Sequence, residues 1–337
     1  MARVRLTDGP DAGLAWHYGD PLGEQRCLAD GSAVVDLSNR QVIALRGADG
    51  LDLLNRLGSA KLAGLPVGAA ASTYLLTARG RLAHYLGLVR VDLVTVLGWT
   101  EPGDGAGLVD RLNRMRFRLD ASAELLPDMA VVWQGTAIPT VPQTVPRAIP
   151  QTAPQRGGVA DCLGGREVFL PRPALAQVLA AGRPAGLWAY AARRIAAGHP
   201  RFGVDTDERT IPNELGVPSD EVSLDKGCYP GQEAVSKIYH RGRPRRRLVR
   251  LLLDGSEERW PNPGAAIQLG GDTIGRAGSI AYHHQLGPIG LGLIDQDSDD
   301  AVTVSVDGVA ATVEPIVPRT SRPTRPSATS PGRMMTP

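Results

Sequence analysis

The sequence has few cysteines, few aromatic residues and no long apolar run. Only three cysteines occur in 337 residues, and Cys27, Cys162 and Cys228 lie far apart in the chain. Such a set is not a disulfide framework and is typical of a reducing cytoplasm, where we expect the protein. No apolar run approaches the roughly 18 residues of a membrane-spanning helix, and the first residues lack the apolar core of a secretion signal. We therefore predict neither a membrane span nor export.

The charge is nearly balanced. The net charge of +2 argues against a protein that coats nucleic acid, and aromatic residues, at 4%, leave few side chains to stack on bases. A hydrophobic content of 42% is enough for a sizeable core, while 40 glycines and 27 prolines predict many turns. Nothing in the sequence demands more than a monomer.

Two segments have little to bury. In residues 138–158 prolines recur at positions 139, 142, 146, 150 and 154, which predicts an extended insertion or linker. The tail 318–337 is rich in Pro, Ser, Thr and Arg, and we expect it to be disordered.

The remaining patterns predict an α+β core followed by a small β-barrel. Aliphatic and β-branched stretches predict strands within 32–37, 41–47, 72–77 and 84–98. Helical spacing predicts helices over 48–58, 173–182 and 185–198, the last ending at Gly198 with Pro200 beyond it. From Arg247 six short strands follow closely, at 248–254, 265–269, 273–282, 289–294, 301–306 and 309–317. The predicted domains are therefore a core over 1–246 and a barrel over 247–317.

Cys228 lies in the stretch DKGCYPGQEAV, residues 225–235, which has the features of a reactive thiol. Lys226 places a positive charge nearby, Gly227 and Gly231 permit close backbone approach, and a helix predicted to begin after Gly231 would favour a thiolate at its positive end. The residues alone leave a functional and a structural cysteine equally open. With no CxxC or HxxxH pair, we predict no metal site, although a ligand shared with a partner stays open.

The octapeptide KGCYPGQE, residues 226–233, resembles the signature of the YgfZ folate-binding proteins, whose mitochondrial counterparts act in maturing iron–sulfur proteins. The resemblance continues upstream through RRIAAGHPRFGVDTDERTIPNE and downstream through KIYHRGRPRRRL. The N-terminal layout, VVDLSNRQVIALRGADGLDLLNRL and LLTARGRL, is similar both to this family and to the related glycine-cleavage aminomethyltransferase. The whole resemblance covers roughly residues 20–317, apart from the proline-rich segment.

This resemblance implies a clover-like fold, with an α+β folate-binding core in two related halves beside a C-terminal β-barrel. It implies tetrahydrofolate, or a derivative, in a central cavity and iron–sulfur client or assembly proteins as partners. It assigns the functional thiol to Cys228, assisted by Lys226. The residues matched to cofactor binding or to support of the motif are Arg194, Glu214, Tyr229, Gly231, Gln232 and Glu233. For Glu214 and Glu233, an ion pair or a helix cap is an equal alternative.

Three departures separate the chain from the aminomethyltransferase. That enzyme has an Asp-Asp pair where His84 and Tyr85 fall, a pterin-holding Glu at Ala196, and Asp where Cys228 stands. These departures argue against aminomethyl transfer, and whether the chain catalyses any reaction is left open.

Two other functions remain as alternatives. One is a folate-dependent one-carbon transferase, and the other is a thiol hydrolase or scaffold without folate, with His84 or His240 as candidate base. Six arginines between 241 and 250 form either a solvated surface or a site for a folate tail or an acidic partner. We interpret Cys27 and Cys162 as structural.

Overall fold

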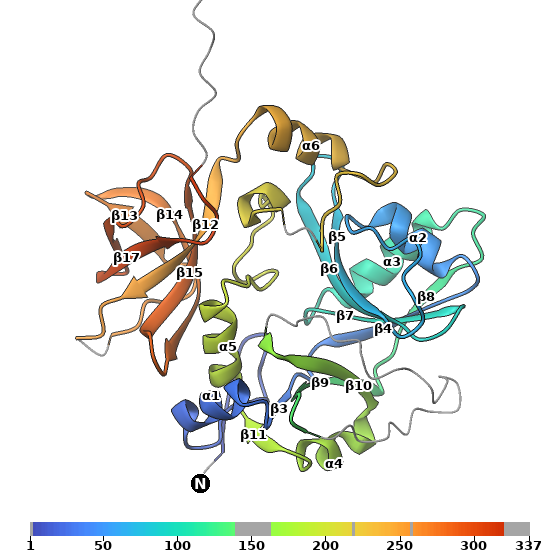
Figure 1. Cartoon of the computed structure of the whole chain (residues 1–337), viewed down its shortest axis with the longest axis horizontal. Coiled ribbons are helices and arrows are strands. Elements are labelled where there is room, and N and C mark those ends of the chain that lie inside the picture. The colour runs from blue at the N-terminus through green and yellow to red at the C-terminus, as the bar shows by residue number, and fades with distance from the viewer. Residues whose placement is uncertain (1–2, 139–162, 218–219, 257–258, 320–337) are drawn as a thin grey trace, which may run out of the picture.

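We describe the protein from a computed structural model that covers residues 3–138, 163–217, 220–256 and 259–319. Three lobes meet at the middle of the molecule (Figure 1). Two are built on open sheets and the third is a closed barrel, so the predicted α+β fold with a C-terminal barrel is confirmed. Almost all of segment 138–158, Cys162 and the tail from 320 lie outside the described residues, so what we predict for them stays a prediction.

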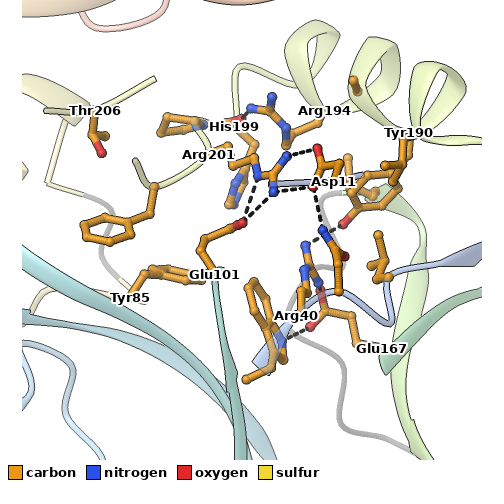
Figure 2. Close-up of a pocket in the computed structure, with 18 of the residues that line it drawn as sticks. Asp11, Arg40, Tyr85, Glu101, Glu167, Tyr190, Arg194, His199, Arg201 and Thr206 are labelled. Carbon is orange, nitrogen blue, oxygen red and sulfur yellow. Dashed lines mark hydrogen bonds and ion pairs between the residues drawn. The ribbon is translucent and has the colours of Figure 1, made fainter. Parts of the chain in front are cut away.

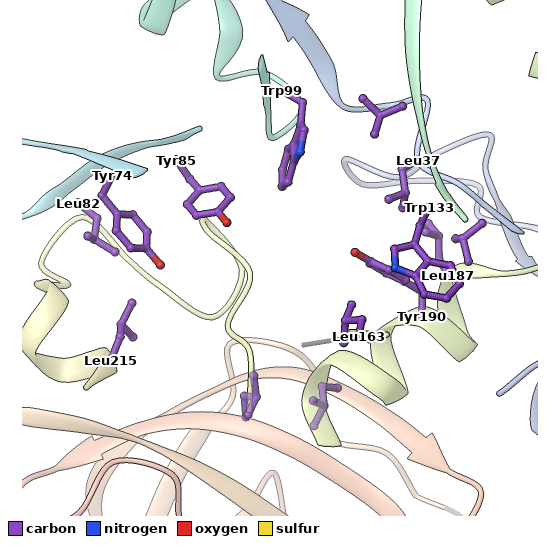
Figure 3. Packing of buried hydrophobic residues seen from close by; sticks show 14 of the residues in the cluster. Leu37, Tyr74, Leu82, Tyr85, Trp99, Trp133, Leu163, Leu187, Tyr190 and Leu215 are labelled. Carbon is purple, nitrogen blue, oxygen red and sulfur yellow. The ribbon is translucent and has the colours of Figure 1, made fainter. Parts of the chain in front are cut away.

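The first lobe is a five-stranded antiparallel sheet with two helices on one face (Figure 1). Its strand order is β5-β6-β7-β4-β8. The elements are β4 Gln41–Arg46, α2 Gly50–Leu57, β5 Ala70–Leu76, β6 Leu82–Arg90, β7 Thr95–Thr100, α3 Gly105–Met115 and β8 Ser122–Leu125. Successive residues of a strand face opposite sides, so Leu86 packs beneath the helices while Tyr85 faces the middle of the molecule (Figure 3).

The stretch 84–98, predicted as strand, is a hairpin whose turn the sequence pattern did not reveal. Val91 N donates to Thr95 O over 3.0 Å, and the Asp92 carboxylate accepts from Val94 N over 2.8 Å. A turn with a single polar residue, Asp92, is therefore enough to reverse a chain that looks aliphatic throughout.

The second lobe is a four-stranded sheet of order β10-β9-β3-β11, in which β11 runs parallel to β3. Val34 and Val132 face α4, while Val35 and Val131 face the main core. The elements are α1 Pro21–Ala29, β3 Ala33–Asp36, β9 Met129–Gly135, β10 Gly165–Pro171, the 3₁₀ turn η2 Arg172–Ala174, α4 Leu175–Leu179, β11 Arg183–Ala185 and α5 Leu187–Ala196. A separate two-stranded sheet precedes them, β1 Val4–Arg5 with β2 Ala15–His17.

The third lobe is a six-stranded closed barrel of order β12-β15-β14-β13-β16-β17. Each of its strands overlaps one predicted from the sequence. Val249 and Leu251 fill its interior, whereas Leu248 and Leu291 join the core shared with α5. The strands are β12 Arg246–Leu253, β13 Ala266–Leu269, β14 Asp272–His283, β15 Gly287–Asp295, β16 Thr303–Val306 and β17 Val309–Pro315.

Two short elements connect α5 to the barrel: the 3₁₀ turn η3 Pro212–Leu215 and helix α6 Gln232–Arg241, which bridges the first lobe and the barrel (Figure 1). The pairing of β14 with β15 shifts register between Ala277 and Ile280, and Asp205 occupies that irregularity. Its Oδ1 accepts from Ser279 N over 2.6 Å. Within the described ranges, no helix has the length and apolar character needed to cross a lipid bilayer.

Candidate functional site

A cavity lies between the five-stranded sheet, β10, α5 and the loop that follows α5. It contains about 920 Å³ of empty space, part of it open to solvent. Tyr74, Tyr85 and Trp99 project into it from the sheet, and Tyr190 projects from α5 on the other side (Figure 3). A concave site with aromatic walls and a few polar groups is the usual form of a small-molecule site.

Arg201 is the centre of one polar cluster on the cavity wall (Figure 2). Its Nη1 and Nη2 donate to the two carboxylate oxygens of Asp11 over 2.6 and 2.8 Å, and its Nε and Nη2 donate to Glu101 Oε2 over 2.9 and 2.7 Å. Burial opposes the charge, but the two carboxylates raise the pKa of Arg201 above its usual range. This cluster ties the N-terminal segment to the end of β7.

Arg40 and Glu167 form a second cluster, deeper in the wall. Arg40 Nη1 lies 2.5 Å from Glu167 Oε1, and Trp99 Nε1 donates to Glu167 Oε2 over 2.5 Å. The Arg40 guanidinium also stacks 3.6 Å above the Trp99 ring. Burial raises the pKa of Glu167, while Arg40 acts in the opposite direction. The pair fixes the orientation of Trp99 at the cavity.

His199 also lines the cavity, from the loop after α5 (Figure 2). Burial lowers the pKa of this imidazole, and nearby Arg194 acts in the same direction while Glu221 opposes it. At neutral pH the side chain is therefore uncharged and offers one donor and one acceptor.

Arg194 is the one predicted cofactor-binding residue that lines this cavity. Its guanidinium donates to Asp205 Oδ2 over 2.7 Å, to the His199 carbonyl over 2.6 Å and to Ser279 Oγ over 2.5 Å. With these three acceptors engaged, Arg194 braces α5 against the barrel and holds the His199 loop.

Cys228 lies on a loop that the rest of its motif holds in place. The thiol is exposed and forms no hydrogen bond within the described ranges. The Lys226 ammonium donates to the carbonyls of Asn55, Gly58 and Ala60 at the end of α2. These contacts direct Lys226 into the C-terminal end of a helix, where a cation is favourable. Burial lowers the pKa of Lys226 to about 8.

The other motif residues support the same loop. Tyr229 is buried and donates to Ser223 O over 3.0 Å, and Gln232 Nε2 donates to Lys226 O over 3.2 Å. Gly231 has φ of 83° immediately before α6, whereas Glu233 is exposed. None of these four is among the residues that line the cavity. A cofactor-binding role for them therefore stays a prediction.

Glu214 lies in an ion-pair network at the start of the barrel. Arg246 donates to both of its carboxylate oxygens over 3.0 and 2.9 Å and to both oxygens of Asp207 over 2.7 and 3.0 Å. Glu214 Oε2 also accepts from Ile211 N over 3.3 Å, which caps the 3₁₀ turn. These are the ion-pair and capping contacts that the sequence left as the alternative.

The arginine run is largely engaged within the chain. Four of its six arginines form salt bridges: Arg243, Arg246, Arg247 and Arg250. Arg241 and Arg245 are exposed and form none among the described residues. The arginine run therefore serves mainly to stabilise the barrel through salt bridges within the chain.

His84 and Tyr85, which replace the acid pair of the aminomethyltransferase, face opposite sides of the sheet. The Tyr85 ring lines the cavity, whereas His84 Nδ1 lies 2.7 Å from Asp104 Oδ1 at the start of α3. No His84 atom lines the cavity, so this imidazole does not replace the missing carboxylates there.

Glu221 is a feature that the sequence did not single out. It is 6% exposed and accepts from Ser72 Oγ over 2.9 Å and from the Tyr85 hydroxyl over 3.0 Å. Its backbone carbonyl accepts from Ser59 Oγ over 2.6 Å. Glu221 therefore connects the cavity wall to the segment that leads to Cys228. No group of three or more His, Cys, Asp or Glu residues suited to a metal ion occurs among the described residues.

The fold is that of the aminomethyltransferases. The crystal structure of glycine cleavage system aminomethyltransferase T from Bartonella henselae matches with a TM-score of 0.74 and 21% sequence identity, covering 92% of each chain. No family model matches the sequence.

The named relatives narrow the class of protein to which this chain is similar. The mitochondrial iron–sulfur cluster assembly factor IBA57 of Homo sapiens is 29% identical, covering 87% of this chain and 85% of the relative. The factor of the same name from Mus musculus is 25% identical over 88% of this chain and 92% of its own length. An aminomethyltransferase of Thermus thermophilus is 33% identical over 45% of this chain. The chain thus has homologues among both groups, and the resemblance to the YgfZ-type superfamily is confirmed.

Proposed function

We propose that this protein binds tetrahydrofolate in its central cavity and supports the assembly or repair of iron–sulfur proteins, with Cys228 as its functional thiol. The observation that carries the proposal is the exposed Cys228 on a loop that Lys226 holds in place. It occurs in a chain whose relatives, matched over most of its length, are named as iron–sulfur cluster assembly factors. The partners we propose are iron–sulfur client or assembly proteins, in the cytoplasm.

The cavity supports the folate part of the proposal. Tyr74, Tyr85 and Trp99 provide aromatic surface for a flat bicyclic ring such as a pterin. The wall also offers donors and acceptors at its polar clusters. Ring stacking and edge hydrogen bonds together are what recognition of a pterin requires.

The Cys228 loop supports a separate site for the thiol. Neither Cys228 nor Lys226 lines the cavity, so folate binding and thiol chemistry fall on different surfaces. The loop fixes the position of the sulfur while leaving it open to a partner protein. A thiol presented in this way is suited to contact with a client or with iron.

The first prediction follows from this separation. Cys228→Ser should bind tetrahydrofolate with the affinity of the unchanged protein, because the thiol lies outside the cavity. The same variant should fail to rescue a strain whose own protein of this type has been deleted. Calorimetric titration and complementation measure the two properties. Full rescue by Cys228→Ser would contradict the thiol role, and absence of tetrahydrofolate binding by the unchanged protein would contradict the folate role.

The main alternative is aminomethyl transfer, which the shared fold favours. Against it stand Ala196 and the orientation of His84 away from the cavity. Turnover with a lipoyl carrier protein would establish this alternative. A thiol hydrolase is less well supported, because no histidine hydrogen-bonds Cys228 in the part of the chain that the structure describes.

A further inference from the structure

Glu221 differs from the carboxylates that line the cavity. Asp11 and Glu101 pair with Arg201, and Glu167 pairs with Arg40. Glu221 is buried, at 6% exposure, yet it forms no salt bridge within the described ranges. Burying a carboxylate without a cation is costly, so its hydrogen-bond donors must compensate for the lost water.

Those donors are hydroxyl groups, and one of them, that of Tyr85, belongs to the cavity wall. Tyr85 donates to Glu221 Oε1 over 3.0 Å, and Ser72 Oγ donates to the same oxygen over 2.9 Å. Tyr74 and Tyr85 are directly paired across β5 and β6, with ring centroids 5.2 Å apart. Figure 3 shows their hydroxyl groups pointing the same way.

The geometry determines what the tyrosines can offer a ligand. A phenol has one proton to donate and two lone pairs, and a carboxylate only accepts. Once its proton is committed to Glu221, the Tyr85 hydroxyl can only accept hydrogen bonds from the cavity side. Burial, reinforced by Glu221, raises the pKa of both tyrosines well above the usual value, so both stay protonated.

We infer that Glu221 is a positioning residue that makes the Tyr85 hydroxyl an acceptor and so selects the reduced pterin over the oxidised one. This inference rests on the proposed folate function. The two ring states differ in hydrogen-bonding character at N5 and N8. Both nitrogens carry N–H donors in tetrahydrofolate, whereas in folic acid both are bare acceptors. An acceptor hydroxyl on the cavity wall attracts the first state and repels the second.

The test compares the dissociation constants of folic acid and tetrahydrofolate, measured by anaerobic calorimetry on the full chain. The unchanged protein should favour tetrahydrofolate. In Glu221→Gln the amide can donate to a tyrosine oxygen and free a phenol proton, so the preference should fall by about tenfold, the value of one hydrogen bond. Tyr85→Phe, which keeps the ring, should reduce the preference in the same direction. Glu124→Gln, on exposed β8, is the matched control and should keep it.

The ratio of affinities separates positioning from structural damage, because general loosening of the cavity would weaken both ligands together. Equal affinity of the unchanged protein for the two forms, or a wild-type ratio in both Glu221→Gln and Tyr85→Phe, overturns this inference and leaves the proposed function standing. Binding of neither form by the unchanged protein overturns the proposed function and the inference with it.

Discussion

Gly231 illustrates why a motif residue need not touch a ligand to be essential. Its φ of 83° lies in the left-handed region, and a Cβ there would lie 2.5 Å from the Thr77 carbonyl oxygen. Together with Lys226 at the end of α2, it fixes where the Cys228 loop crosses the first lobe. The motif therefore supplies the Cys228 thiol and also fixes its position.

Gly231→Ala should accordingly destabilise the protein by about 1–3 kcal/mol or more, since backbone strain and a steric clash act together. Chemical denaturation measures the change. Gly227→Ala in the same loop is the control, because its Cβ would meet nothing within 4 Å and its φ is not positive. We expect that variant to stay within about 0.5 kcal/mol of the unchanged protein. Equal losses in the two variants would show that the loop does not depend on the conformation of Gly231.

Sequence reasoning located single residues better than it located their partners. Cys228 and Arg194 could be singled out from a local motif. Arg40 with Glu167, and Arg201 with Asp11, could not, because each pair is separated by more than a hundred positions and meets only through the fold. Glu221, after Ser219 and Asp220 in the sequence, likewise resembles a surface residue until Ser72 and Tyr85 are seen to donate to it.

At the scale of elements, short-range patterns predicted the barrel and half of the core. Barrel strands alternate inward Val249 and Leu251 with outward Leu248, and Gly, Pro or Asp punctuates each turn. Helices α1 and α3 were missed because their apolar stripes are short and contain glycine. Strands β9 and β10 flank the proline-rich segment, and their pairing across it carries no local signal.

The contact between α5 and the barrel gives a prediction at this scale. Arg194 and Asp205 are paired with side chains only 9% and 1% exposed, so Asp205→Asn leaves a buried cation without its carboxylate. We expect a loss of about 3–5 kcal/mol in the free energy of unfolding. Glu208→Gln is the matched control, because the Arg209–Glu208 pair is 76% and 81% exposed and should contribute little. A loss below that of the control would mean that the barrel holds α5 through apolar contacts alone.

For the whole molecule, the cavity is the place where separate parts of the chain meet. Asp11 comes from the N-terminal segment, Tyr85 from the first lobe, Glu167 from the second and His199 from the loop after α5 (Figure 2). A ligand that contacts all four of these parts stabilises their arrangement, and the ligand dissociates when any one part moves away. Ligand binding should therefore raise the stability of the folded chain as a unit.

Tetrahydrofolate at a hundred times its dissociation constant should raise the free energy of unfolding by about 2.7 kcal/mol, as mass action requires for a ligand that binds only the folded state. Ala191→Trp, which fills the cavity from α5, should fold but should lose this ligand-induced rise in the free energy of unfolding. Ala197→Trp, at the exposed end of the same helix, should keep it. Thermal unfolding with and without ligand measures all three proteins. Undiminished stabilisation of Ala191→Trp would place the folate elsewhere on the molecule, since a tryptophan and a pterin cannot share the same space.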